Sequence, residues 1–140
     1  MLFPKKVKYR KWQTLRENPN KVGKATRSIT VAFGSHGLKS MTAARVTSNQ
    51  IEAARKTISR AVGKTGRVWV RLFPDMPFTK KPAEVKMGKG KGDLEGYCAR
   101  VLPGQVLFEV DGALPPVARE ALRKGGAKMP VKTKVVERAR

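Results

Sequence analysis

Alternating apolar and polar residues predict several short β-strands in this chain. The clearest lies at 67–73, which is rich in β-branched and aromatic residues and is stopped by Pro74. The same alternation predicts a strand at 28–33, followed by a turn at 34–37. Because successive side chains of a strand point to opposite faces, the apolar face of the strand at 67–73 must be covered by a second layer.

Further apolar runs predict strands in the second half of the chain. The runs 97–102 and 106–110 are joined by Pro-Gly-Gln at 103–105, which is typical of a hairpin, so we expect these two strands to pair. A final short strand is expected at 131–136.

Helical periodicity predicts two helices. Residues 47–50 have the S/T-x-x-E/Q form of a capping box, and the apolar residues that follow recur at helical spacing, so a helix is expected over about 48–62, ended by Gly63. The prolines at 115–116 suit the first turn of a second helix, which continues to the glycines at 125–126. These glycines should fray its end, at roughly 1 kcal/mol per glycine.

The charge of the chain indicates a nucleic acid as its partner. Its 140 residues, enough for one domain, contain 31 Lys and Arg against 10 Asp and Glu, which gives a formal net charge of +21 and an isoelectric point near 10.9. Solubility needs a net charge of only about 2 to 8, and like charges in such excess repel one another until a polyanion binds. No apolar run approaches the ~18 residues of a membrane span, and no basic amphipathic helix is visible, so no membrane partner is expected.

Much of this charge lies in residues 1–27, which carry nine Lys or Arg residues against one acid, Glu17. No helical or strand periodicity is long enough for this segment to fold alone, so we expect an extended basic arm. Tyr9 and Trp12 lie among its charges, and they either stack on bases or hold the arm against the core. The sequence leaves both alternatives open.

A second basic segment, residues 85–92 with the sequence Val-Lys-Met-Gly-Lys-Gly-Lys-Gly, is here called the finger. Its glycines remove the Cβ atoms that would restrict φ and hold the backbone away from a partner, while its lysines supply ammonium groups between them. Its spacing fits neither the phosphate-binding loop of nucleotide hydrolases nor the dinucleotide-binding motif. We therefore expect a flexible loop, anchored by strands at both ends, that lies against phosphates.

The residues needed for catalysis are scarce. The chain has one histidine, His36, expected in a turn or in packing, and one cysteine, Cys98, expected to be a buried, unreactive thiol. Four acids near the finger could in principle bind a metal, but they more simply orient lysines or end the loop: Asp75, Glu84, Asp93 and Glu95. We expect no enzymatic activity, no metal, no cofactor and no small-molecule substrate.

Two segments, Lys-Thr-Gly-Arg-Val-Trp-Val-Arg-Leu-Phe-Pro at 64–74 and Met-Gly-Lys-Gly-Lys-Gly at 87–92, are joined by Thr-Lys-Lys-Pro-Ala-Glu-Val at 79–85. They resemble the signature segments of the bacterial-type large-subunit ribosomal protein L-sixteen family. The resemblance covers nearly the whole chain in order, and it includes further matching segments at 1–5, 9–11, 50–55 and 118–121.

The resemblance implies an α+β fold, with two helices packed on a mostly antiparallel sheet and a protruding, hammerhead-like glycine-lysine loop. It also implies a structural component of the large ribosomal subunit, in a bacterium or in an organelle that encodes its own ribosomal proteins. Its implied partners are large-subunit ribosomal RNA, other large-subunit proteins and transfer RNA in the aminoacyl site, with contact in the peptidyl site left open. The alternative from the charge alone is a free RNA- or DNA-binding regulator or chaperone.

The expected division of the chain is an arm at 1–27, an RNA-binding domain at 28–136 and a basic tail at 137–140. Lys86 stands where the family commonly has arginine, so it offers a point charge in place of a planar fork. The residues expected to contact RNA lie in the arm, the first helix and the finger with the residues that precede it: Lys5, Lys6, Lys8, Arg10, Lys11, Arg16, Arg55, Arg60, Lys80, Lys81, Lys86, Gly88, Lys89, Gly90 and Lys91.

Overall fold

The structure, a computed structural model, describes residues 1–14 and 18–139 of the chain. Two helices and two antiparallel sheets confirm the expected α+β class. The elements in chain order are η1 (Pro19–Lys21), β1 (His36–Ser40), β2 (Ala44–Thr47), α1 (Ser48–Val62), β3 (Arg67–Val70), β4 (Met76–Lys80), β5 (Asp93–Val101), β6 (Val106–Asp111), α2 (Pro115–Gly126) and β7 (Thr133–Glu137).

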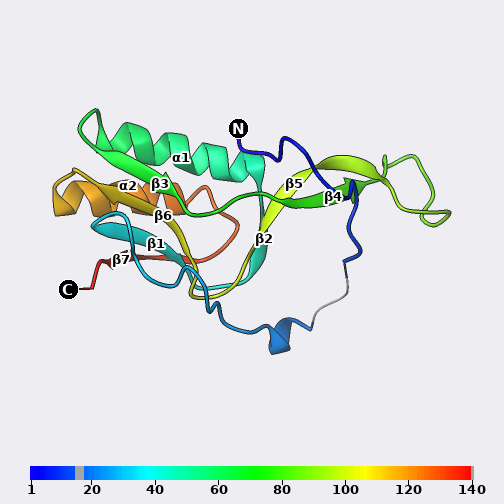
Figure 1. Ribbon diagram of the computed structural model, residues 1–140, viewed down its shortest axis with the longest axis horizontal. Helices are drawn as coiled ribbons and strands as arrows, with labels where there is room; N and C mark the ends of the chain where they lie inside the picture. Colours follow the sequence, from blue (N-terminus) through cyan, green and yellow to red (C-terminus); the bar gives the residue numbers. More distant parts are fainter. Residues whose placement is uncertain (15–17, 140) are drawn as a thin grey trace.

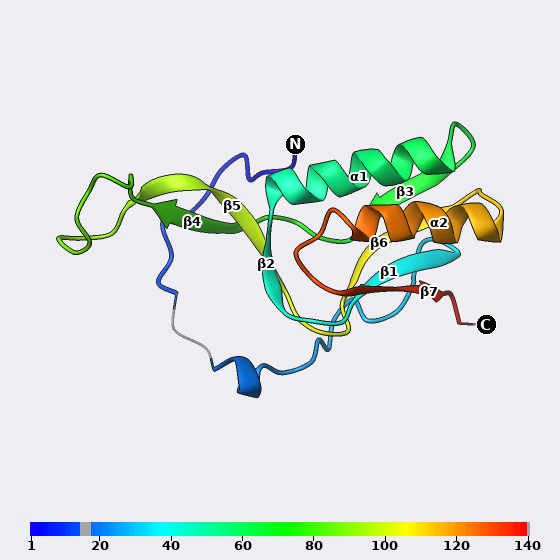
Figure 2. The same cartoon turned by 180° about the vertical axis from the view of Figure 1, so that it is seen from behind.

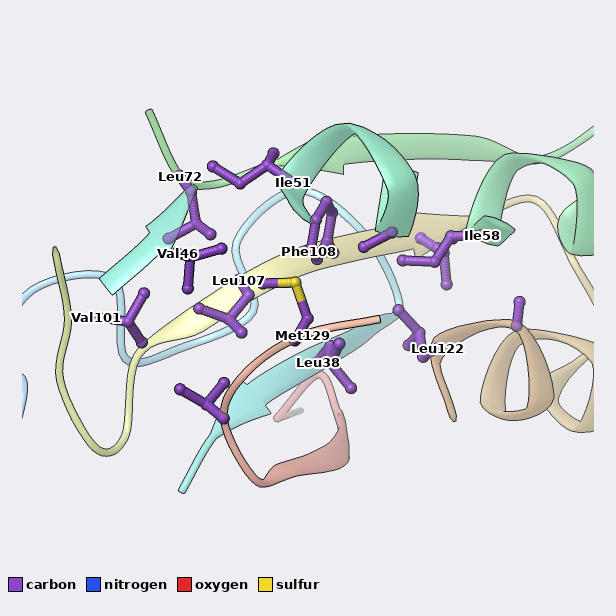
Figure 3. Packing of buried hydrophobic residues seen from close by; sticks show 14 of the residues in the cluster. Leu38, Val46, Ile51, Ile58, Leu72, Val101, Leu107, Phe108, Leu122 and Met129 are labelled. Atoms are coloured by element: carbon purple, nitrogen blue, oxygen red, sulfur yellow. The ribbon is translucent and has the colours of Figure 1, made fainter. Parts of the chain in front are cut away.

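A four-stranded sheet in the order β3-β6-β1-β7 forms the body of the molecule, and α1 and α2 pack side by side on one of its faces (Figures 1 and 2). The core between these layers is mostly aliphatic. Leu38 of β1, Phe108 of β6, Ile58 of α1 and Leu122 of α2 all lie in it and are almost completely buried (Figure 3). Burial of these side chains supplies the main free energy that holds the helices on the sheet.

A second sheet, in the order β2-β5-β4, extends from one end of the body (Figure 1). Its central strand, β5, has nine residues and runs from the exposed loop into the hydrophobic core. The end of β5 near Val101 is buried and pairs with β2, whereas its start at Asp93 is exposed and pairs with the end of β4. The sheet therefore carries the chain outward from the core to the loop at 81–92.

Helix α1 has the predicted bounds. Thr47 is its N-cap, and the reciprocal bonds of the capping box are both present: the backbone amide of Gln50 donates to Thr47 Oγ1, and the amide of Thr47 donates to Gln50 Oε1. Gly63 ends the helix with φ of 79°, a conformation that glycine adopts without a steric penalty. The local signals at both ends thus determine this element.

The predicted fraying of α2 at its glycines is wrong, because Gly125 and Gly126 are buried helical residues. A Cβ atom on Gly125 would lie 2.4 Å from Cγ1 of Ile58 in α1, and one on Gly126 would lie 2.3 Å from Oγ1 of Thr133 in β7. The missing side chains let α2 approach both neighbours closely. Tertiary packing here outweighs the low helix propensity of glycine.

The strand predicted at 28–33 and the turn predicted at 34–37 are also wrong. His36–Ser40 is β1, which pairs with both β6 and β7, so His36 is a buried strand residue. The segment before it lies across the face of the sheet opposite the helices. There Val31 packs onto Gly37, and a Cβ atom added to Gly37 would lie only 2.8 Å from Cγ2 of Val31. The apolar alternation at 28–33 reflects this packing and not strand pairing.

The predicted hairpin of 97–102 and 106–110 does not form. The two runs become β5 and β6, which lie in different sheets. The turn between them directs the chain from one sheet to the other, and residues distant in sequence hold it in place. The amide of Gly104 donates to Ser40 O at 2.7 Å, and the amide of Ala25 donates to Pro103 O at 2.8 Å. A central strand such as β6, with Val106–Val110 fully buried, takes its partners from the sheet and not from the nearest strand in sequence. The strand predicted at 67–73 is likewise shorter, ending at Val70.

Replacing Gly125 by alanine tests the close packing of the helices. Gly125→Ala should lower the free energy of unfolding by about 1–3 kcal/mol, even though alanine favours a helix by about 1 kcal/mol over glycine. The reason is that the new methyl group meets Ile58, which is fully buried and has no room to move. Urea denaturation of the purified protein measures the difference.

Gly23→Ala is the matched control, because a Cβ atom at Gly23 would meet nothing within 4 Å. We expect its stability to stay within about 0.5 kcal/mol of the original. A Gly125→Ala protein more stable than the original would contradict the packing argument.

Candidate nucleic-acid interface

The finger occupies most of the loop that joins β4 to β5, at the end of the second sheet farthest from the helices (Figures 1 and 2). Lys80 pairs with Asp93 at its base, and Gly92 packs so tightly there that a Cβ atom would lie 3.0 Å from the Lys80 backbone. Residues 82–91 are all exposed. The loop thus has a fixed base and a solvated, lysine-rich tip.

The tip curls because three consecutive residues have left-handed backbone conformations. Gly88, Lys89 and Gly90 have φ of 99°, 59° and 107°. Lys89 adopts this conformation at a penalty of about 1–2 kcal/mol for a residue with a Cβ atom, whereas the glycines do so freely. The ammonium group of Lys81 donates to Gly88 O, which ties the curl back toward its base.

The first part of the arm lies against both the body and the finger. Ser48 Oγ at the start of α1 lies 3.5 Å from Met1 Sδ, and Leu2 packs on the hydrophobic core. The chain then passes the second sheet, where Lys91 of the finger donates to Trp12 O (Figure 1). The arm therefore connects the beginning of α1 to the finger.

The expected RNA-binding residues of the arm are mostly solvent-facing. Lys5, Lys6, Lys8 and Arg10 are exposed and Lys11 is half-buried, while Arg16 lies outside the described residues. Tyr9 and Trp12 are 64% and 41% exposed, so each presents surface on which a base could stack. Lys8 lies over the Tyr9 ring, 5.7 Å from its centroid.

The remaining predicted residues are not all brought together. Lys80, Lys81, Lys86, Lys89 and Lys91 lie on the finger and its base, next to the arm. In contrast, Arg60 is exposed in the last turn of α1, roughly 18 Å along the helix from Ser48 at 1.5 Å per residue. Arg55 is engaged by Glu52, with Nε 3.2 Å from Oε2, and this hydrogen bond holds the pKa of Glu52 below its usual value.

The segment 28–34, which follows the arm, is fastened to the sheet by a buried carboxylate that the sequence reasoning missed. Glu109 of β6 is fully buried, and its Oε1 accepts hydrogen bonds from the amides of Ala32, Phe33 and Gly34 at 2.7, 2.9 and 3.3 Å. Its Oε2 accepts from Arg71 Nη1 at 2.6 Å. The sequence feature that could have indicated this role is the single acid inside the apolar run 106–110, because a buried charge requires partners.

These partners determine the ionisation of Glu109. Burial alone would raise the pKa of its carboxyl, but the hydrogen bonds from Arg71 and from the three amides outweigh burial and hold the pKa below its usual value. Arg71 in turn donates to Thr30 O at 3.3 Å and to Ser28 Oγ at 3.4 Å. One ion pair thus fixes the segment 28–34 to the sheet.

No catalytic or metal-binding arrangement accompanies this basic surface in the part of the chain that the structure describes. Cys98 is buried as predicted, and burial raises the pKa of its thiol, which makes it a poor nucleophile. Within residues 1–14 and 18–139, no three His, Cys, Asp or Glu side chains gather as metal ligands. Neither described helix is long and apolar enough to cross a membrane.

Comparison with known proteins agrees with the geometry. A family model described as "Ribosomal protein L16p/L10e" matches residues 4–136. The chain belongs to this family. Among its curated relatives is "Large ribosomal subunit protein uL16" of Bartonella quintana (strain Toulouse), 49% identical over 138 residues, which cover 99% of this chain and 98% of the relative. Proteins of the same description from Caulobacter vibrioides (strain NA1000 / CB15N) and Maricaulis maris (strain MCS10) are each 51% identical over 138 residues, covering 99% of this chain and 94% and 98% of theirs.

Membership of the ribosomal L16p/L10e family confirms the resemblance drawn from the signature segments at 64–74 and 87–92. This family consists of structural, non-enzymatic proteins, which confirms the expectation of no catalytic activity. The predicted ribosomal location is confirmed as well.

Replacing Glu109 by glutamine tests the fastening of the segment 28–34. Glu109→Gln should lower the free energy of unfolding at neutral pH by about 3 kcal/mol, because the largely buried Arg71 loses its counter-charge. The folded-state pKa of Glu109 lies below the ordinary 4.5, so its stabilisation is complete above that pH and is lost as the pH falls through the folded-state pKa. The variant should therefore lose less stability than the original between neutral pH and about pH 3, as measured by urea denaturation at each pH.

Glu120→Gln serves as the control, since Glu120 forms an exposed pair with Arg123 on α2. We expect little change in its stability at neutral pH. If Glu109→Gln and the original lost equal stability on acidification, the carboxylate would not hold the segment 28–34 in the way described.

Proposed function

We propose that this chain binds large-subunit ribosomal RNA as a structural component of the large ribosomal subunit, through the joint surface of its arm and finger. The observation that carries the proposal is the hydrogen bond from Lys91 to Trp12 O, which brings two separately basic segments side by side. Residues 1–14 contain no Asp or Glu, and neither does the finger. Their combined surface is therefore strongly cationic.

The physical driving force is electrostatic. With a formal net charge of +21, the free protein repels itself, and each phosphate that pairs with a lysine or arginine releases condensed counterions. Backbone amides at the curled tip add donors, because the glycines at 88 and 90 have no Cβ atoms to keep a phosphate away. Ribosomal RNA is the polyanion that membership of this family favours over a free regulator or chaperone.

The tip of the finger contacts transfer RNA in the aminoacyl site, with the peptidyl site as the alternative. Its position supports this assignment, since the tip lies far from the two helices and stands away from the rest of the molecule (Figure 1). The body and arm are thus free to hold ribosomal RNA and neighbouring large-subunit proteins while the tip reaches a mobile partner. The protein organises a binding site and supplies no chemical group.

Removing two finger lysines tests the RNA contact. In Lys89→Ala/Lys91→Ala, the slope of log affinity for RNA against log salt should shrink by about 0.7 to 0.9 for each lost phosphate contact. Filter binding or fluorescence anisotropy with a large-subunit ribosomal RNA fragment at several salt concentrations measures the slope. The Lys91 change also removes the bond to Trp12 O, so affinity at low salt should fall too.

Lys124→Ala/Lys128→Ala removes the same charge from exposed positions at the end of α2, away from the arm and finger. Its salt slope should change less than that of the finger variant. Equal slopes in the two variants would show that only total charge matters, and an unchanged slope in the finger variant would show that its lysines face solvent.

Deleting residues 86–92 tests the transfer RNA contact. The five remaining residues, 81–85, still suffice to connect β4 to β5, because hairpin loops of two to five residues are common. The body should remain folded, with its cooperative thermal unfolding preserved, since the finger buries little apolar surface. Ribosomes that carry the deletion should bind transfer RNA more weakly in the aminoacyl site.

The variant Lys86→Ser/Lys89→Ser/Lys91→Ser keeps the loop length and removes its charge, together with the hydrogen bond from Lys91 to Trp12 O. If the deletion weakens transfer RNA binding and the serine variant does not, the length of the finger matters more than its charge. Loss of folding in the deletion variant would contradict the view that the finger is separate from the core.

A further inference from the structure

Two aromatic rings meet on the face of the main sheet opposite the helices. Phe33, just before β1, stacks with Trp69 of β3, with ring centroids 6.3 Å apart and planes inclined by 20°. Phe33 is 56% exposed although it sits beside a well-packed sheet, and Trp69 is half-buried. An exposed ring in a fixed pair presents a π-face to the solvent, and nucleobases stack on such faces.

The position of Phe33 is held by strong interactions. Its amide donates to the buried carboxylate of Glu109 at 2.9 Å, and the guanidinium carbon of Arg71 lies 5.1 Å from its ring centroid. Arg71 is itself fixed by its ion pair with Glu109. The ring is thus oriented before any partner arrives, which lowers the entropy lost on binding.

The segment that carries Phe33 is rich in basic residues. No Asp or Glu occurs between Glu17 and Glu52 in the sequence, and this stretch includes Arg27 and Lys39. Arg67 lies two residues before Trp69 on the same face of β3 and is exposed, opposite Asp111 of β6. An aromatic pair in a basic environment matches an unpaired nucleotide, which offers a π-face and a phosphate together.

We propose that Phe33 and Trp69 form a platform on which an unpaired nucleobase of RNA stacks, as a second RNA contact separate from the arm and finger. This inference rests on the proposed RNA-binding function and adds a base-stacking site to it. β3 and the finger lie toward opposite ends of the molecule, so one RNA that touches both must span the body (Figure 1). The platform contributes affinity by stacking and the finger contributes it by charge, which makes the two contacts separable by experiment.

The tryptophans of the chain provide a direct reporter. The sequence contains two, so Trp12→Phe leaves Trp69 as the only one. Adding a single-stranded oligoadenylate of about eight nucleotides to this full-length protein should quench the Trp69 fluorescence as a base stacks. Phe33→Leu in the same background should weaken the affinity roughly tenfold and reduce the quenching, with the salt slope unchanged because no phosphate contact is lost.

Four comparisons sharpen the test. Phe33→Tyr keeps a ring, so its affinity and its Trp69 quenching should match those of the protein with Phe33. Phe73→Leu removes the ring of another exposed phenylalanine and should leave the affinity and the quenching unchanged. Inorganic polyphosphate should bind through charge without quenching Trp69. Lys89→Ala/Lys91→Ala should reduce the salt slope but preserve the quenching.

The outcomes separate this inference from the function on which it rests. Binding of oligoadenylate with a normal salt slope, but with no quenching and no effect of Phe33→Leu, would overturn the platform and leave charge-driven RNA binding intact. Failure of the original protein to bind RNA at low salt would overturn both. Trp69 fluorescence that changed with protein concentration in the absence of RNA would assign the rings to contact between two copies of the chain and would also overturn the platform.

Discussion

The ion pair between Glu109 and Arg71 is the interaction on which the arrangement of this molecule depends. A chain with three times as many basic as acidic residues has few attractive charges to use in folding, and it places one of them in the middle of its main sheet. There, away from water, the carboxylate binds a guanidinium and three amides of the segment 32–34. The arm therefore leaves the body from a fixed position, and the exposed ring of Phe33 is fixed with it.

Three further acids form ion pairs on the surface of the body. Glu52 and Glu120 each pair with an arginine three residues later on their own helix, and Glu137 of β7 pairs with Arg119 of α2. Exposed pairs of this kind add little stability. They do, however, neutralise basic charge on the helices and the main sheet, while the arm and finger keep theirs. The molecule as a whole keeps a formal net charge of +21, which attracts a polyanion before contact.

The sequence predicted those features whose cause is local. The bounds of α1 follow from the capping box at Thr47 and from Gly63, and the finger was recognisable from its glycines and lysines. The errors concern features decided by distant residues. Strand pairing of β6, the route of residues 28–35 and the helical state of Gly125 all depend on which surfaces meet in the folded chain, and periodicity does not encode that. The contact between Lys91 and Trp12 O was unpredictable for the same reason, since every residue offers the same carbonyl group.

The long central strand of the second sheet has a mechanical consequence. Between Ala99 in the core and Asp93 at the finger's base, β5 extends about 20 Å at roughly 3.3 Å per residue, so it acts as a lever anchored at one end. A tilt of about 5° at the anchored end would displace the far end by about 2 Å, several times the range of about 0.5 Å over which a hydrogen-bond distance varies. A hydrogen bond from Lys91 to Trp12 O links the far end of this strand to the arm. The position of the tip therefore depends on the N-terminal segment as well as on the core.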